Sequence, residues 1–331
     1  MRLILKLLLL LSLVLAALIG SIAWWANAPL QMRVSTVDFR IAPGSSLRSA
    51  VTQMQDAGIA VNPDLLAMLA RWRGVGSGIK AGSYSISHRL TPEELLVKLV
   101  RGDVTQGEVV LVDGLTFRQW RARLDQHPDL KHETQGLDAT EIAGRLGIEG
   151  GTIEGWLFPD TYLFDKHSSD LEVLARAYRA MRTRLDSAWA GRDATLPYRN
   201  PYEALIMASI IEKETGRSDD RAQIAAVFTN RLRKGMPLQT DPTVIYGMGE
   251  KFDGNLRKRD LQTDTPYNTY IRAGLPPSPI AMPSMAALQA ALHPADSDAL
   301  YFVARGDGSS QFSRTLDEHN RAVNKYQRGN K

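Results

Sequence analysis

One stretch near the middle of the chain decides how the fold is organised: Asn200-Pro201-Tyr202-Glu203-Ala204-Leu205-Ile206-Met207-Ala208-Ser209-Ile210-Ile211-Glu212-Lys213-Glu214-Thr215-Gly216. Asn200 followed by Pro201 is a typical start of a helix, and Gly216 is a residue that readily ends one in the left-handed conformation. The residues between them are apolar nearly all round, which is typical of a buried helix. Its face of small side chains also carries Glu212. A buried carboxylate is costly unless it is paired, so Glu212 has partners or serves chemistry.

Three other carboxylates compete with Glu212 for a chemical role. Glu214 lies roughly 200° around the same helix, so the two cannot face one cleft. Glu154 and Asp160 belong to the aromatic segment 153–162 and are backup candidates for an acid. The alternative is that the aromatic segment is a core turn. For the pair on the helix, the alternative is that each carboxylate is bonded to backbone or to an arginine.

Composition excludes several classes of site. The chain has 331 residues, and its net charge of +4 comes from 40 basic and 36 acidic residues. This small, dispersed excess gives no reason to expect nucleic acid as a partner. There is no cysteine, which excludes disulfides and thiolate metal sites, and the 6 histidines show no metal-ligand spacing. We therefore expect no metal and no cofactor.

The N-terminal region, residues 1–28, reads as a cytoplasmic tip and a transmembrane anchor. Its apolar core, 7–25, has about the 20 residues that span a bilayer. Arg2 and Lys6 favour a cytoplasmic N-terminus, and Trp24-Trp25 suit the far interface. The alternative is a cleaved signal peptide with a site at 26–28, but the apolar run is long and Pro29 would follow the cut. In either case we expect the remaining chain outside the cytoplasm.

Residues 33–104 have the pattern of a small α+β region. Strands are expected at 34–41 and 80–87, with helices at 47–55 and 65–73 between them and a further helix at 95–100. The order strand–helix–helix–strand resembles that of a LysM module, a family that binds glycans containing N-acetylglucosamine. The alternative is a spacer that holds the rest of the chain off the membrane.

Residues 105–331 mix helices with a few short strands. A long amphipathic helix is expected at 170–189, further helices at 218–235 and 316–327, and a last strand at 299–304. The sequence therefore predicts an α+β protein in three parts: an N-terminal transmembrane helix, a small LysM-like βααβ subdomain and a larger mixed α+β domain.

Several separate motifs in one order resemble the YceG-like family. They lie at 208–215, 238–249, 267–270, 274–277 and 293–294, and the resemblance extends over essentially the whole chain. It implies a single-pass inner-membrane lyase, a lytic transglycosylase, with its catalytic domain (105–331) in the periplasm. Such an enzyme cuts the MurNAc-GlcNAc β-1,4 bond inside peptidoglycan glycan strands and leaves 1,6-anhydro-MurNAc ends. The resemblance also implies that it limits strand growth near peptidoglycan synthases, the penicillin-binding proteins. The family's catalytic glutamate falls on Glu212.

This chemistry explains why one carboxylate suffices. Glycoside hydrolysis usually needs an acid plus a second carboxylate as nucleophile or base. In a lytic transglycosylase the substrate's own C6 hydroxyl attacks the anomeric carbon. One glutamic acid can then protonate the bridging oxygen and afterwards accept the C6 hydroxyl proton.

Five residues are expected to line the substrate cleft, because amides and hydroxyls hydrogen-bond sugars and tyrosines stack on them: Gln239, Thr240, Tyr246, Asn268 and Tyr270. The alternative is that the polar residues cap turns and that the tyrosines belong to the core.

Two rival functions remain at this point. One is a non-catalytic peptidoglycan-binding scaffold that recruits cell-wall synthases. The other is a lysozyme-like hydrolase, which would leave reducing ends.

Overall fold

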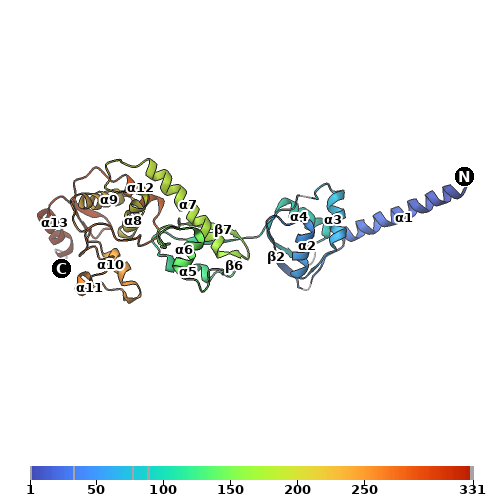
Figure 1. Ribbon diagram of the computed structural model, residues 1–331, viewed down its shortest axis with the longest axis horizontal. Coiled ribbons are helices and arrows are strands. Elements are labelled where there is room, and N and C mark those ends of the chain that lie inside the picture. The colour runs from blue at the N-terminus through green and yellow to red at the C-terminus, as the bar shows by residue number, and fades with distance from the viewer. Residues whose placement is uncertain (1, 33, 77, 88–89, 329–331) are drawn as a thin grey trace. The chain divides into compact units, whose positions relative to one another are not determined.

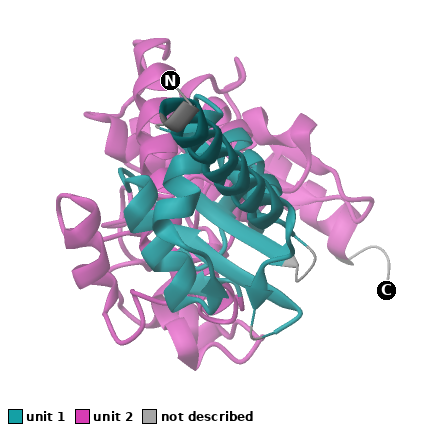
Figure 2. Cartoon of the chain, turned by 90° about the vertical axis from the view of Figure 1, so that its right-hand side faces the viewer, with its two compact units in different colours: residues 1–108, 129–131, 163–168 teal, residues 109–128, 132–162, 169–331 magenta. Residues whose placement is uncertain are grey.

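The computed structural model describes residues 2–32, 34–76, 78–87 and 90–328. The chain forms two compact units, coloured separately in Figure 2. The first comprises residues 1–108, 129–131 and 163–168, and the second comprises 109–128, 132–162 and 169–331. Of the boundaries expected from the sequence, residues 1, 33 and 331 lie outside the described part. The division into 1–28, 33–104 and 105–331 stays a prediction.

The first unit contains the expected order of strand, helix, helix and strand. Its elements are α1 (Arg2–Asn27), β1 (Gln31–Met32), β2 (Thr36–Ile41), α2 (Leu47–Asp56), β3 (Ile59–Ala60), α3 (Pro63–Trp72), β4 (Gly82–Ser87) and α4 (Pro92–Arg101). β2 pairs antiparallel with β4 in a register from Thr36↔Ser87 to Ile41↔Gly82, and β1 pairs with β3. Side-chain caps at Asn62 and Thr91 start α3 and α4. The mixed α+β character is confirmed, whereas the likeness to a LysM module stays a prediction.

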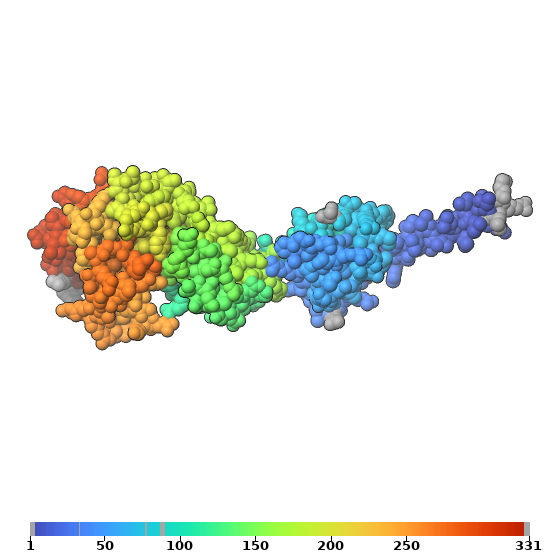
Figure 3. Space-filling model, viewed as in Figure 1, coloured from blue at the N-terminus to red at the C-terminus, as the bar shows by residue number. Residues whose placement is uncertain are grey.

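Helix α1 is the one described helix long and apolar enough to cross a membrane, over Ile4–Asn27. Figure 3 shows it as a rod that extends from the first unit, and its leucines are exposed along most of their length. Its end is tied into the unit. Ala26 is buried in the core, and the N–H of Leu30 donates to the carbonyl of Leu90 at 2.8 Å.

The second unit is mostly helical (Figure 1). Its elements, together with the strands that it shares with the first unit, are β5 (Gln106–Leu111), α5 (Phe117–Asp125), β6 (Leu130–Lys131), α6 (Ala139–Leu146), β7 (Asp160–Asp165), β8 (Ser168–Ser169), α7 (Asp170–Ala190), α8 (Pro201–Glu214), α9 (Ser218–Arg233), α10 (Asp241–Met248), α11 (Lys258–Gln262), α12 (Met285–Leu292), β9 (Tyr301–Ala304), β10 (Ser310–Ser313) and α13 (Leu316–Val323). β5 pairs with β7, β6 with β8, and β9 with β10. The long helix predicted at 170–189 is confirmed as α7, and the strand at 299–304 as β9.

Helix α8 lies at the centre of the second unit. Every residue from 204 to 211 is buried, and the helix packs against α7, α9, α10 and α12. The prediction of a helix buried nearly all round is confirmed. Its start is also as expected, since the Asn200 side chain accepts a hydrogen bond from the N–H of Glu203 at 3.1 Å.

The end of α8 differs from the prediction. The helix stops at Glu214, and Thr215 follows in an extended conformation with φ −149° and ψ 137°. Gly216 is therefore not a left-handed cap. The Thr215 hydroxyl accepts the N–H of Arg217 at 3.0 Å, which holds the chain in this turn without a glycine. The next helix, α9, has Arg217 at its N-cap and no side-chain cap.

Candidate active site

Glu212 lies in the last turn of α8 and is half-buried. Its Oε2 accepts a hydrogen bond from the backbone N–H of Ser284 at 2.9 Å and a second, short one from the Ser284 hydroxyl. Among the described residues, nothing donates to its other oxygen, Oε1. The two oxygens of the carboxylate are therefore inequivalent, one fixed and one available.

Ser284 is the N-cap of α12, and its hydroxyl also accepts the N–H of Ala287 at 3.2 Å. The Glu212 carboxylate thus sits at the N-terminal end of that helix, where unpaired N–H groups and the helix dipole favour negative charge. One serine therefore both caps a helix and holds one oxygen of the Glu212 side chain in place.

A turn after β5 packs against the same glutamate. Gly114 has φ +67°, and a Cβ built on it would lie 3.8 Å from Cγ of Glu212. Its N–H donates to the carbonyl of Met282 at 2.8 Å, and the Lys213 ammonium donates to its carbonyl at 3.0 Å. The turn is therefore tied both to α8 and to the segment that precedes α12.

Glu154, a backup candidate, is the more deeply buried carboxylate, with 6% of its surface exposed. Its oxygens accept the N–H of Phe117 at 3.0 Å and the hydroxyl of Tyr246 at 3.1 Å. Burial raises the pKa of Glu154 to about 7, although both hydrogen bonds oppose the shift. Glu154 thus joins the start of α5 to α10.

Glu214 has different surroundings from Glu212, as the helical spacing predicted. It accepts the hydroxyl of Thr240 at 2.8 Å. Burial raises the pKa of Glu214, the bond from Thr240 lowers it, and the neighbouring Asp241 raises it. Asp160, the last candidate, is exposed at the start of β7 and accepts the N–H of Thr161 at 2.8 Å.

The five expected cleft residues do not form one cluster but contact different neighbours. Tyr246 bonds to Glu154, as above. Tyr270 donates to Asp241 at 2.5 Å, close to the pair formed by Thr240 and Glu214. The Gln239 side chain accepts from Arg231 at 3.1 Å, and its backbone has φ 52°, which is rare for a residue other than glycine.

Asn268 is buried, with 0% of its surface exposed. Its amide donates to the carbonyls of Leu261 at 3.1 Å and Thr263 at 2.7 Å, and its oxygen accepts the N–H of Tyr270 at 3.0 Å. These bonds brace the loop that carries Tyr270. A direct contact between this amide and a glycan would require the loop to open, and the role of all five residues in binding stays a prediction.

The model of the YceG-like family matches residues 39–325. The chain belongs to the YceG-like family. It is 33% identical over 311 residues to an endolytic murein transglycosylase of Bacillus subtilis, covering 88% of this chain and 85% of the relative. An endolytic murein transglycosylase of Streptococcus pneumoniae is 28% identical over 319 residues, covering 86% of this chain but 57% of the longer relative.

The fold of the family is also seen in a crystal structure of a yceG-like protein from Listeria monocytogenes. It aligns with a TM-score of 0.54 and 31% identity, covering 86% of this chain and 98% of the other. Membership in the family confirms the resemblance drawn from the motifs.

Ser284 and Gly114 were missed by the sequence reasoning. A serine before the apolar segment Met285–Leu292 signals a helix N-cap, but not that it faces Glu212. Gly114 lies in a turn before Thr116, another N-cap, and gave no functional signal. Both approach Glu212 only through the fold.

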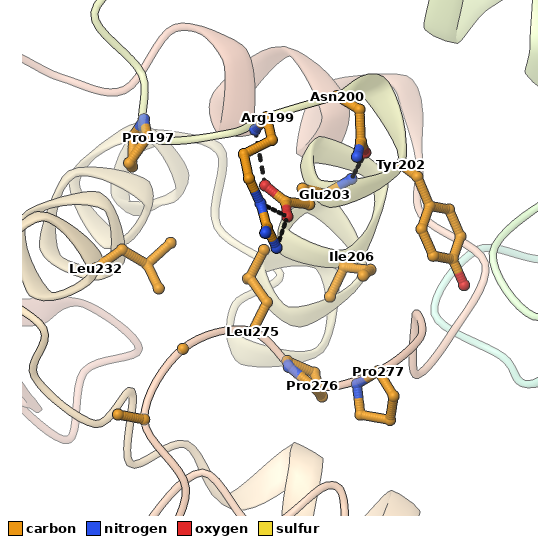
Figure 4. Close-up of a pocket in the computed structure, with 12 residues that line it drawn as sticks. Pro197, Arg199, Asn200, Tyr202, Glu203, Ile206, Leu232, Leu275, Pro276 and Pro277 are labelled. Atoms are coloured by element: carbon orange, nitrogen blue, oxygen red, sulfur yellow. Dashed lines mark hydrogen bonds and ion pairs between the residues drawn. The ribbon is translucent and has the colours of Figure 1, made fainter.

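A cavity of about 560 Å³ opens at the other end of α8 (Figure 4). Arg199, Tyr202 and Glu203 line it, together with the family motif 274–277. The Arg199 guanidinium pairs with Glu203 at 2.5 Å. Glu203 precedes Glu212 by nine residues, about 13 Å along the helix, so this cavity is separate from the surroundings of Glu212.

One group of side chains has the spacing of a metal site. Ligand atoms of Asp125, His132 and Asp170 all lie within 4.8 Å of one another. Asp170 is fully buried, and it accepts the N–H of Glu133 at 3.0 Å and the hydroxyl of Thr134 at 2.5 Å. These donors account for the buried charge without an ion.

Proposed function

We propose that this protein is a membrane-anchored endolytic lytic transglycosylase. Its substrate is the MurNAc-GlcNAc β-1,4 bond inside peptidoglycan glycan strands, and its products carry 1,6-anhydro-MurNAc ends. The observation that supports this most directly is the carboxylate of Glu212, within the family motif 208–215, held through Oε2 by Ser284 with Oε1 left available. The two relatives named endolytic murein transglycosylases support the same substrate.

In this mechanism Glu212 works alone. Its Oε1 proton passes to the bridging oxygen as the C1–O bond breaks, and Ser284 stabilises the carboxylate that forms. The C6 hydroxyl of the same MurNAc then bonds to C1 and gives its proton to Glu212. No water is consumed, and the glutamic acid is regenerated.

The other parts of the chain fit this reaction. α1 would anchor the protein in the inner membrane with its N-terminus cytoplasmic and both units periplasmic, since Lys6 and Trp24 mark opposite ends of the apolar run. The βααβ portion of the first unit would act as a LysM-like glycan contact or as a spacer. Peptidoglycan synthases are the partners that such an activity would need nearby if it ends strand growth.

Analysis of the cleaved ends tests the proposal against its two rivals. The detergent-solubilised full chain is incubated with purified glycan strands, and the products are identified by mass spectrometry. Anhydro ends are expected. Reducing ends would identify a hydrolase, and uncut strands would identify a scaffold without activity.

Replacing Glu212 with Gln tests the assigned residue. The amide keeps the shape of the side chain but cannot supply the proton, so anhydro products should disappear while glycan strands still bind. Glu214→Gln examines the rival carboxylate and should leave anhydro products detectable. Undiminished cleavage by Glu212→Gln would refute the assignment.

A further inference from the structure

An apolar face of the first unit stands exposed on α3. Met68 and Trp72 lie one helical turn apart, with 40% and 68% of their surfaces exposed. Arg71 lies beside them, and its guanidinium forms no hydrogen bond or ion pair among the described residues. Large apolar side chains that share an exposed face indicate an interaction surface.

This face is continuous with the apolar helix α1. A cavity of about 490 Å³ lies between the two helices, lined by Leu18, Ile19 and Ile22 of α1 and by Met68, Arg71 and Trp72 of α3. Figure 1 shows α3 beside the end of α1 that enters the unit. Whatever surrounds this part of α1 therefore also surrounds the exposed face of α3.

The position of the cavity along α1 gives its depth in a bilayer. Trp24 and Trp25 mark the end of the apolar run, where tryptophans favour the membrane–water interface. Ile22 and Leu18 precede Trp24 by two and six residues, which corresponds to about 3 and 9 Å along a helix. If α1 spans the membrane, the cavity lies within the leaflet next to the first unit, close to the headgroups.

We propose that the α3 face formed by Met68, Arg71 and Trp72 inserts into that leaflet, with lipid acyl chains filling the cavity. The inference rests on α1 being the uncleaved anchor of the proposed function. The first unit would then lie against the bilayer and not at the end of a free stalk. Trp72 sits at the level of the headgroups, and the Arg71 guanidinium binds lipid phosphate while its stem stays in apolar surroundings.

Lipid is the occupant that the contacts favour. Leu18 and Ile19 are 56% and 50% exposed on the very helix that would face acyl chains, and they line the same cavity as the α3 residues. The free guanidinium matches an anionic phosphate in charge. A single continuous apolar surface therefore runs from the span to the folded unit.

The test uses the absence of cysteine from the chain. Met68→Cys in the full chain is labelled with an environment-sensitive fluorophore and reconstituted in vesicles of phosphatidylethanolamine and phosphatidylglycerol, with and without a lipid that carries a nitroxide near its headgroup. We expect blue-shifted emission and quenching by the nitroxide. Trp72→Cys is a second labelling site in case the first variant does not fold.

Arg101→Cys is the matched control. Arg101 is exposed at the C-terminal end of α4, a ten-residue helix about 15 Å long whose N-terminal end follows Leu90. A label there should show neither the blue shift nor quenching. Ile19→Cys reports insertion of the anchor.

Three outcomes overturn the inference. Met68 and Trp72 labels that behave like Arg101 while Ile19 is quenched would refute the contact alone. A blue shift without quenching would show that protein covers the face. An unquenched Ile19 label would refute the anchor as well.

Discussion

The two hydrogen bonds from Ser284 give Glu212 a chemical asymmetry that Glu154 lacks. Glu154 has a donor on each oxygen, from Phe117 and from Tyr246. Glu212 has both of its donors on Oε2 and none among the described residues on Oε1. A group that first gives and then takes a proton needs one oxygen open to the substrate, which only the second arrangement provides.

Ser284→Ala should therefore lower the rate of cleavage. A hydrogen bond to a charged group is worth about 1.5–3 kcal/mol, so kcat should fall about tenfold or more. The measurement is the initial rate of anhydro-end formation at saturating glycan. Ser284→Thr keeps the hydroxyl and should recover most of the rate. If Ser284→Ala loses only helix stability and keeps its kcat, the serine is a cap and nothing more.

Glu154 predicts a dependence of stability on pH. Its pKa is raised from 4.5 to about 7, so between these values the native protein holds a proton that the unfolded chain has released. The free energy of unfolding should therefore fall as pH rises through this window, by roughly 3 kcal/mol from this group. Glu154→Gln, which cannot ionise, should gain stability relative to the native chain between pH 5 and pH 8.

Chemical denaturation of both proteins at the two pH values measures the difference. Glu149→Gln, which removes an exposed carboxyl, controls for the change in net charge. Glu214 also has a raised pKa and adds its own pH dependence to the stability of each protein. The test is therefore the difference in free energy of unfolding between Glu154→Gln and the native chain, not the pH profile of one protein. A difference that stays constant with pH would contradict the assignment to Glu154.

The surroundings of a residue could be predicted from the sequence only where its neighbours lie on the same helix. The helix around Glu212 and its separation from Glu214 followed from the angle between residues on one helix. Ser284 lies 72 residues from Glu212 in the sequence, and no spacing pattern indicates that two residues so far apart in the chain are in contact. The buried hydrogen bond from Tyr246 to Glu154 connects residues 92 positions apart in the sequence, and it was missed for the same reason.

The central helix α8 can pack closely on α12 because both helices present small side chains to each other. Ala204 and Ala208 of α8 and Ala287 and Ala291 of α12 are all 0% exposed. Close packing of these two helices places the start of α12, and with it Ser284, against the last turn of α8. The alanines therefore support the site because they allow α8 and α12 to lie close together.

Ala291→Leu should destabilise the second unit. Adding methylene groups to a filled core costs about 1–3 kcal/mol, and the strain should move α12 relative to α8. The readouts are the unfolding midpoint and the rate of glycan cleavage, and both should fall. Ala286→Leu is the matched control, because that alanine is exposed on the same helix. Equal stability of the two variants would show that the contact is not tight.

Elements were predicted well where a local signal decides them. Asn62, Thr91 and Asn200 each start a helix through a side-chain cap, and a proline follows each of them, which is a local helix-start signal. The end of α8 was predicted wrongly, because Gly216 permits a left-handed cap but does not require one. The bond from Arg217 to Thr215 selects an extended turn there.

Attachment of the chain to a membrane depends on whether α1 is retained or cleaved off. The A-x-A pattern at 26–28 would allow cleavage of a signal peptide, and the sequence alone left that alternative open. Ala26 is 3% exposed within the hydrophobic core of the first unit, and Trp25 packs against that core. Cleavage after Ala28 would remove both side chains from a packed interior and leave a cavity.

The mature protein should therefore retain α1 as a permanent anchor. Residues 2–27 should be found by mass spectrometry in the chain purified from membranes, and the protein should stay in the membrane pellet after an alkaline carbonate wash, because a spanning helix resists extraction that releases peripheral proteins. Pro29→Ala removes the proline after the candidate site, and we expect this chain to stay intact too, because the apolar run is longer than that of a typical signal peptide. A soluble chain that begins at Pro29 would contradict the prediction and would also remove the surface on which the proposed lipid contact of α3 depends.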